Sequence, residues 1–184
     1  MTSSQPFDIT VGGKYAPTIR RIVTGHREDG KAVVASEDEI KRLDLTEEHA
    51  TFAVMWSTEE SPSDNMDTRD GALRPVFSGS SHNQNGGSVL RIVDFPPGIQ
   101  SPMHRTQSVD YGIVLWGEIE VELDSGEKRT LKQSEVCVQK GTNHLWRNNT
   151  KEWTRVAYVL LDAKPIVIDG KRLQDEGYPD SAQQ

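Results

Sequence analysis

Two stretches carry the pattern that decides the fold: PPGIQSPMHRTQSVDYGIVLWGE at residues 96–118, and EVCVQKGTNHLWRN at residues 135–148. In the first stretch His104 precedes a turn-prone segment, and Asp110 follows it at the start of the next expected strand. His144 lies on another short strand, far along the chain. Side chains from such separate strands converge where a sheet folds back on itself, so the pattern indicates a closed or two-layered β structure.

The segments around these stretches have the length and alternation of β-strands. SVLRIVDF at 88–95 ends at consecutive prolines, and residues 118–123 alternate glutamate with Ile119, Val121 and Leu123. We expect strands at 50–57, 88–95, 111–123, 128–131, 136–138, 144–148 and 155–161. Seven or more short strands separated by turns predict an all-β sandwich or barrel.

The N-terminal half adds a hairpin and a long polar segment. Residues 20–36 place β-branched runs on either side of Asp29-Gly30, which predicts a β-hairpin. The acidic stretch 37–49 is compatible with a helical turn or a short helix. Residues 58–85 are polar and aperiodic, so we expect a long loop, and the polar tail from residue 174 should be frayed.

Length and charge restrict the function classes. A chain of 184 residues is expected to form one domain, and its net charge of −7 argues against nucleic-acid or anionic-membrane partners. Cys137 is the single cysteine, which excludes an internal disulfide and fits a reducing compartment. Because the sequence shows neither a signal-peptide pattern nor a run of transmembrane length, we expect a cytoplasmic protein that does not interact with membranes.

The side chains expected to converge have metal-binding chemistry. His104, Asp110 and His144 offer two imidazoles and one carboxylate with open positions for other ligands. This donor set is typical of non-haem iron and also serves zinc or manganese. His104 and Thr106 are two residues apart and so share one face of an extended strand. An alternative for Asp110 is a surface ion pair with the nearby Arg105.

The two stretches resemble the two signature motifs of the cupin superfamily. In the first motif, five residues separate Gly98 from His104, and six residues separate Asp110 from Gly117. In the second, Gly141, His144 and Asn148 match in spacing, while Gln139 replaces the usual proline. Thr106 stands where the family has its second histidine, and Asp110 where it has glutamate. These two departures remove one nitrogen ligand and shorten one carboxylate arm.

The resemblance implies a specific architecture. Residues 1–184 should form a single cupin domain, a jelly-roll β-barrel whose core spans about 86–163 and whose N-terminal β extension spans about 15–57. The hairpin sequence is similar to the opening of small cupins from microbes and fungal secondary-metabolite clusters. Many single-barrel cupins dimerise through N-terminal strands, so a homodimer formed near residues 15–36 is expected.

Several functions remain open within this family. The leading hypothesis is a metal-dependent enzyme that acts on a small aromatic or polyketide-like metabolite as a lyase or isomerase, by decarboxylation or dehydration. One alternative is a non-haem iron dioxygenase or other oxidoreductase, and a second is a small-molecule binding protein without turnover. His104, Asp110 and His144 would hold an iron, zinc or manganese ion. Thr106, Arg105 and Trp146 are candidate catalytic residues, although Arg105 points away from the pocket if its strand is regular.

Overall fold

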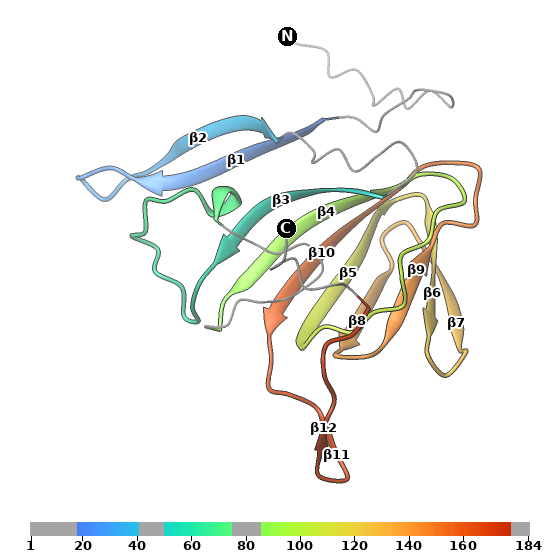
Figure 1. Ribbon diagram of the computed structural model, residues 1–184. Helices are drawn as coiled ribbons and strands as arrows, with labels where there is room; N and C mark the ends of the chain where they lie inside the picture. Colours follow the sequence, from blue (N-terminus) through green and yellow to red (C-terminus); the bar gives the residue numbers. More distant parts are fainter. Residues whose placement is uncertain (1–17, 41–49, 75–85, 178–184) are drawn as a thin grey trace, which may run out of the picture. The chain divides into compact units, whose positions relative to one another are not determined.

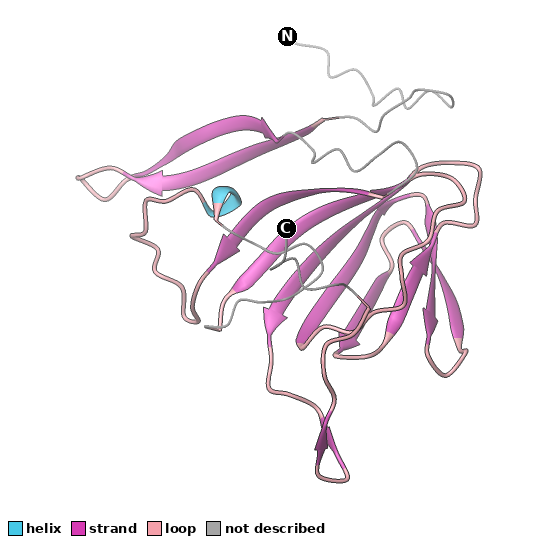
Figure 2. Cartoon of the chain, viewed as in Figure 1, coloured by secondary structure: helices cyan, strands magenta, loops and turns pink. Residues whose placement is uncertain are grey.

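The computed structural model describes residues 18–40, 50–74 and 86–177. Within these ranges the chain is almost entirely β, with a single turn of 3-10 helix (Figure 2). The chain divides into two compact units, with the boundary between residues 42 and 43. No helix in the described part is long and apolar enough to cross a lipid bilayer.

The first unit contains the predicted hairpin. Strand β1 (Ile19–His26) pairs antiparallel with β2 (Ala32–Ile40), and the turn is closed by a hydrogen bond from the Arg27 amide to the Lys31 carbonyl. Gly30 in this turn has a φ of 79°, a conformation that favours glycine. The expectation of a helical turn from residue 37 is wrong for residues 37–40, which continue β2; residues 41–49 lie outside the described part.

The second unit contains a five-stranded and a three-stranded antiparallel sheet (Figure 1). The larger sheet has the order β3-β4-β10-β5-β8 and the smaller one β7-β6-β9. Their strands are β3 (Thr51–Thr58), β4 (Ser88–Phe95), β5 (Ser108–Trp116), β6 (Glu118–Leu123), β7 (Lys128–Lys132), β8 (Val136–Lys140), β9 (His144–Arg147) and β10 (Thr154–Asp162). Each of these lies where the sequence predicts a strand, which confirms the all-β fold class.

One predicted strand is divided into two. The sequence suggested a continuous strand over 111–123, whereas Gly117 separates β5 in one sheet from β6 in the other. Gly117 has a φ of 80°, and a Cβ at this position would lie 2.6 Å from the Thr154 hydroxyl. A residue with both constraints must be glycine, and it lets the chain pass from one sheet to the other.

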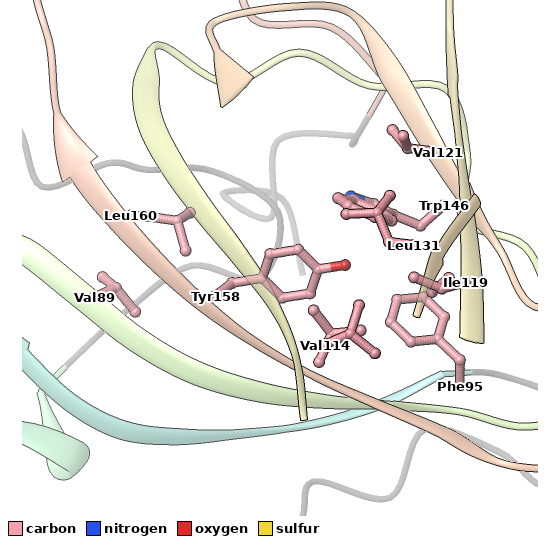
Figure 3. Packing of buried hydrophobic residues seen from close by; sticks show 10 residues of the cluster. Val89, Phe95, Val114, Ile119, Val121, Leu131, Trp146, Tyr158 and Leu160 are labelled. Atoms are coloured by element: carbon pink, nitrogen blue, oxygen red, sulfur yellow. The ribbon is translucent and has the colours of Figure 1, made fainter. Parts of the chain in front are cut away.

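The inner faces of the two sheets enclose the hydrophobic core (Figure 3). Phe95, Val114 and Val156 come from the five-stranded sheet, and Ile119 and Trp146 come from the three-stranded sheet. All five are buried, at 3% exposure or less. The alternation seen in the sequence therefore marks the side of each strand that faces the interior.

Asn148 fixes the corner at the end of β9. Its side chain is fully buried, and its amide nitrogen donates to the carbonyls of Phe95 and Glu152 at 3.0 and 2.7 Å. Its side-chain oxygen accepts from the Thr150 amide and hydroxyl. The motif asparagine is thus a structural residue that ties the start of β10 to the end of β4.

The segment between β3 and β4 is described as far as residue 74. It contains the 3-10 helix Gly71–Leu73, whose first turn is capped by the Asp70 side chain accepting from the Ala72 amide at 2.9 Å. Arg74 donates to the Ser57 carbonyl at 2.6 Å. Part of the predicted long loop is therefore held against β3, while residues 75–85 lie outside the described part.

The C-terminal segment is more ordered than the sequence suggested. After β10 the chain forms a two-residue ladder between β11 (Val167–Ile168) and β12 (Lys171–Arg172). Glu176 then exchanges backbone hydrogen bonds with Arg105 at 3.0 and 3.1 Å. The predicted frayed tail is therefore wrong for residues 174–177, because backbone pairing holds them; residues 178–184 lie outside the described part.

Candidate functional site

His104 and His144 lie side by side, as the sequence predicted. Their backbones form an antiparallel bridge in which each amide donates to the other's carbonyl, at 2.8 and 2.9 Å. The two imidazole centroids are 4.3 Å apart, and the residues are only 5% and 2% exposed. The bridge joins the start of the first motif to β9, so two histidines forty residues apart share one site.

Hydrogen bonds fix the tautomer of both rings. The Nδ1 atom of His104 lies 2.9 Å from the Pro102 carbonyl, and Nδ1 of His144 lies 2.9 Å from the Thr142 carbonyl. A carbonyl can only accept, so each Nδ1 carries a proton. The lone pair of each neutral ring is then on Nε2, which is the usual arrangement of a metal-binding histidine.

The surroundings keep both rings neutral. Burial, followed by the proximity of His144, lowers the pKa of His104 to about 3. Burial lowers the pKa of His144 to about 4, and the positive charge of Arg91 acts in the same direction. At neutral pH both imidazoles are therefore uncharged and able to donate an electron pair.

Asp110 is buried on β5 and hydrogen-bonded within its own strand region. Thr106 donates to its Oδ2 at 3.4 Å, and the hydroxyls of Thr106 and Ser108 are 3.0 Å apart. The other carboxylate oxygen, Oδ1, has no hydrogen-bond partner among the described residues. Burial raises the pKa of Asp110, against the opposing effect of the Ser108 hydroxyl. Thr106, in place of the motif's second histidine, thus contacts the carboxylate that stands in place of the motif's glutamate.

Arg105 lies apart from the histidines. Its guanidinium pairs with the Glu176 carboxylate at 2.9 Å and lies 3.7 Å from the Asp124 carboxylate. The alternative in which Asp110 forms a surface pair with Arg105 is therefore wrong, because Arg105 already has acidic partners and Asp110 is buried. A catalytic role for Arg105 stays a prediction that this arrangement does not favour.

Trp146 lies beside the site, on the same face of β9 as His144. Its ring contacts the His144 ring edge-on at a centroid distance of 6.1 Å and the Tyr158 ring at 5.4 Å. Figure 3 shows Trp146 and Tyr158 extending toward each other from the two sheets. Trp146 therefore forms a wall between the histidines and the apolar core.

The sequence reading missed Arg91. It lies on β4 directly opposite Tyr158 of β10, with its guanidinium carbon 5.8 Å from the Tyr158 ring centre. Its Nε is buried and has no hydrogen-bond partner in the described part of the chain. The signal was available, because Arg91 lies two residues from both Val89 and Val93 and so shares their face of β4.

Gln139, which replaces the proline of the second motif, is buried on β8. It is 3% exposed and lies opposite Asp110 in the β5–β8 ladder. Neither atom of its side-chain amide has a hydrogen-bond partner among the described residues. A buried amide without partners is unfavourable by itself, so its surroundings deserve a functional explanation.

The donor set fits a metal ion only in part. His104 and His144 have the tautomer and the neutral charge that a divalent ion requires. However, no group of three His, Cys, Asp or Glu side chains is close enough together, among the residues that the structure describes, to hold an ion. The two histidines therefore fit as ligands, whereas Asp110 as a third ligand stays a prediction.

Curated relatives cover most of the chain. It is 44% identical over 167 residues to the phomopsin biosynthesis cluster protein C' of Diaporthe leptostromiformis, covering 87% of this chain and 88% of that protein. It is 39% identical over 181 residues to the cupin-domain-containing oxidoreductase srdD of Neurospora crassa, covering 92% and 89%. Each match therefore spans more than four-fifths of this chain and of the relative.

One solved structure is similar over most of the chain. The cupin domain of Schizosaccharomyces pombe Cnp3 matches with a TM-score of 0.46 at 14% identity, covering 80% of this chain and 89% of that one. No family model matches the sequence. The motif residues, the two antiparallel sheets and the extended identity to named cupins lead to one assignment. The chain belongs to the cupin superfamily, among the small cupins related to proteins of fungal biosynthetic clusters.

Proposed function

We propose that this cupin is an oxidoreductase of secondary metabolism that acts on a small organic metabolite inside the barrel. The observation that carries the proposal is the buried pair of neutral imidazoles, His104 and His144, with centroids 4.3 Å apart. Burying two imidazoles is unfavourable in free energy unless their Nε2 atoms bind a ligand. A divalent metal is the ligand that their tautomers suit. The single thiol, Cys137, agrees with work in the reducing cytoplasm.

His104 and His144 would hold the metal, with Asp110 as a proposed further ligand. An iron ion there would supply electrons to dioxygen, while zinc would supply only Lewis acidity. The protein's own residues have separate tasks. Trp146 restricts water on one side of the histidines, and Thr106 holds the Asp110 carboxylate in place by its hydroxyl.

Arg91 favours an acidic or carbonyl-bearing substrate. Burial is the main cause of the lowered pKa of both histidines, and the positive charge of Arg91 lowers it further. A metal on the histidines would add a second positive centre near Arg91. An anionic or strongly polar oxygen between the two centres would relieve their repulsion, so we propose that the substrate presents such a group there.

The names of relatives favour the oxidoreductase over the lyase. Proteins of Neurospora crassa, Hypocrea virens and Aspergillus ruber that are 36–41% identical to this chain are named cupin-domain-containing oxidoreductases. A redox reaction on a metabolite is therefore the leading proposal. Decarboxylation or dehydration, the leading hypothesis from the sequence, stays an untested alternative.

The first experiment measures metal content. Protein purified without chelators or nickel is analysed by mass spectrometry of the elements, alongside His104→Ala, His144→Ala and Asp110→Ala. We expect about one divalent ion per chain, lost in both histidine variants. His26→Ala, which changes an exposed histidine on β1, is the matched control. Wild-type protein that stays metal-free after anaerobic reconstitution with iron, zinc and manganese would contradict the proposed metal site.

The second experiment distinguishes the reaction classes. Metal-reconstituted protein is incubated with extracts of a fungus that makes secondary metabolites. The products are compared by mass spectrometry with those of an extract incubated without the protein. An oxidoreductase adds oxygen to, or removes hydrogen from, a metabolite, and consumes dioxygen if it is an oxygenase. Products that have lost only water or carbon dioxide, with no dioxygen consumed, would restore the lyase hypothesis.

A further inference from the structure

The barrel has a seam between strands β7 and β8. In the described part, β8 is the outermost strand of the five-stranded sheet and β7 the outermost strand of the three-stranded sheet. They are consecutive in the chain and joined by the short turn 133–135, yet they belong to different sheets. Two edge strands that diverge from a turn leave the space between the sheets open at that side.

A cleft of about 640 Å³ occupies this seam. Its walls are mainly apolar and come from β6, β7 and β8, while charged side chains lie near its rim. The lining includes Val121, Leu123, Leu131, Val136, Cys137 and Val138, with Glu127, Arg129 and Glu135 as the charged members. The volume lies within the range of small-molecule pockets, which is about 300–1,000 Å³.

Gln139 is the buried polar residue of this lining. As described above, its amide oxygen and nitrogen have no hydrogen-bond partner among the described residues. An unpaired amide in an apolar wall is unfavourable unless a bound molecule supplies the missing hydrogen bonds. The amide can donate and accept at once, so it can recognise a hydroxyl or a carbonyl group.

The cleft adjoins the candidate metal site through neighbouring side chains. Gln139 is the cross-strand partner of Asp110, and Leu123 is the cross-strand partner of His144. Burial raises the pKa of the Cys137 thiol, which lines the cleft, and the charge of Asp110 raises it further. A molecule seated in the cleft would therefore have one end close to the residues of the proposed reaction.

We propose that the seam cleft binds the apolar body of the substrate, and that Gln139 determines specificity by hydrogen-bonding an oxygen on that body. This inference rests on the proposed function for the identity of the ligand as substrate. It adds a substrate class: a largely apolar ring compound with a hydroxyl or carbonyl group, of a size that fits about 640 Å³. The charged rim remains in water, while the ring displaces water from Val121, Leu131 and Cys137.

Equilibrium dialysis of the full chain without added metal tests the inference. The probes are naphthol and methylnaphthalene, which share a ring system and differ in the hydroxyl group. The wild-type protein should bind naphthol more tightly than methylnaphthalene. Gln139→Leu should weaken naphthol binding about fivefold and change methylnaphthalene binding less than about twofold, since one hydrogen bond is lost. Gln174→Leu, an exposed glutamine, is the matched control.

Two further measurements separate this role from a structural one. Leu131→Trp should fill the cleft and abolish binding of both probes. Gln139→Leu should raise the thermal unfolding temperature of the ligand-free protein, because it removes two unpaired polar atoms from an apolar wall. Weaker naphthol binding together with a higher unfolding temperature would show that Gln139 serves to bind ligand and does not stabilise the fold.

Other outcomes would overturn the proposal. If Gln139→Leu binds both probes like wild type, water rather than ligand satisfies the amide. If Leu131→Trp leaves binding intact, the probes bind elsewhere. If neither probe binds and the protein sediments as a dimer with protected β8 amides, the seam is an interface between copies. Because no metal or turnover is involved, each result is independent of whether the oxidoreductase proposal holds.

Discussion

Two buried histidines with lowered pKa values make the metal-free protein sensitive to acid. In an unfolded chain each imidazole has a pKa near 6.5. In the fold the pKa is about 3 for His104 and about 4 for His144. Between these values the unfolded state binds more protons, so the free energy of unfolding falls as the pH drops. Asp110 opposes this trend because its pKa is raised, but it is one group against two.

We therefore expect the free energy of unfolding of metal-free protein to decrease from pH 6.5 to pH 4.5 in urea titrations. His144→Asn keeps a donor for the Thr142 carbonyl and should reduce the slope by up to about 1.4 kcal/mol per pH unit. His26→Asn, on the exposed face of β1, should leave the slope unchanged. An unchanged slope in His144→Asn would mean that His144 titrates normally in the fold.

The charge of Arg91 should act against metal binding. Burial lowers the pKa of both histidines most, and the Arg91 guanidinium lowers it further, so this charge should also repel a divalent ion held by the two rings. Arg91→Gln should therefore raise the affinity for zinc about tenfold in competition with a chromogenic chelator. The exposed Arg129→Gln is the matched control. Equal affinity in Arg91→Gln and wild type would show that solvent screens this charge from the site.

At the scale of elements, the passage from β5 to β6 depends on Gly117. Its φ is 80°, and an added Cβ would lie 2.6 Å from the Thr154 hydroxyl oxygen and 2.8 Å from the Trp153 carbonyl oxygen. Gly126 has a similar φ of 86° in the β6–β7 turn, with no atom within 4 Å of such a Cβ. The two glycines share the backbone requirement and differ in the space around them.

This pair separates backbone strain from steric contact. Gly126→Ala should cost about 1 kcal/mol of unfolding free energy, from the left-handed backbone alone. Gly117→Ala should cost about 3 kcal/mol, because the surrounding backbone must also shift. Urea unfolding followed by circular dichroism measures both. Equal costs at the two positions would show that the β5–β6 corner relaxes around the new methyl group.

At the scale of the whole molecule, every residue of the candidate site belongs to the second unit, residues 43–184. The site and the seam cleft are formed by β4 to β10 and their connections. The hairpin β1–β2 forms its own ladder, with the Arg20–Glu37 and Arg21–Asp38 ion pairs across it. The predicted homodimer would form through this hairpin, and the predicted single domain would include it.

Removing residues 1–42 tests both predictions. The remaining chain should unfold cooperatively and bind zinc as the full chain does, because the barrel contains its own core. If the homodimer forms through the hairpin, analytical ultracentrifugation should show a dimer for the full chain and a monomer for the shortened one. A shortened chain that fails to fold would support a single domain from residue 1 to residue 184.

The sequence predicted the fold class and the pair of histidines because both are local signals. Strands follow from alternation, and the spacing from Gly98 to His104 and from Gly141 to His144 matches a family pattern. The same spacing suggested Asp110 as a ligand and named Gly117 only as a motif position. The exchange of sheets at Gly117 is not encoded in a local pattern, because the atoms that crowd this glycine belong to Trp153 and Thr154, far along the chain.

Only the tertiary structure decided which partners the charged side chains have and where the cleft lies. Arg105 and Arg91 are the same residue type, yet Arg105 pairs with the Glu176 carboxylate, whereas the guanidinium of Arg91 lies 5.8 Å from the Tyr158 ring centre. That difference depends on which distant strands are neighbours. The same holds for the seam, where the side-chain amide of Gln139 has no hydrogen-bond partner among the described residues. Alternation determines which side of a strand is buried, but the partners of a buried group come from closure of the barrel, a long-range property that no segment contains by itself.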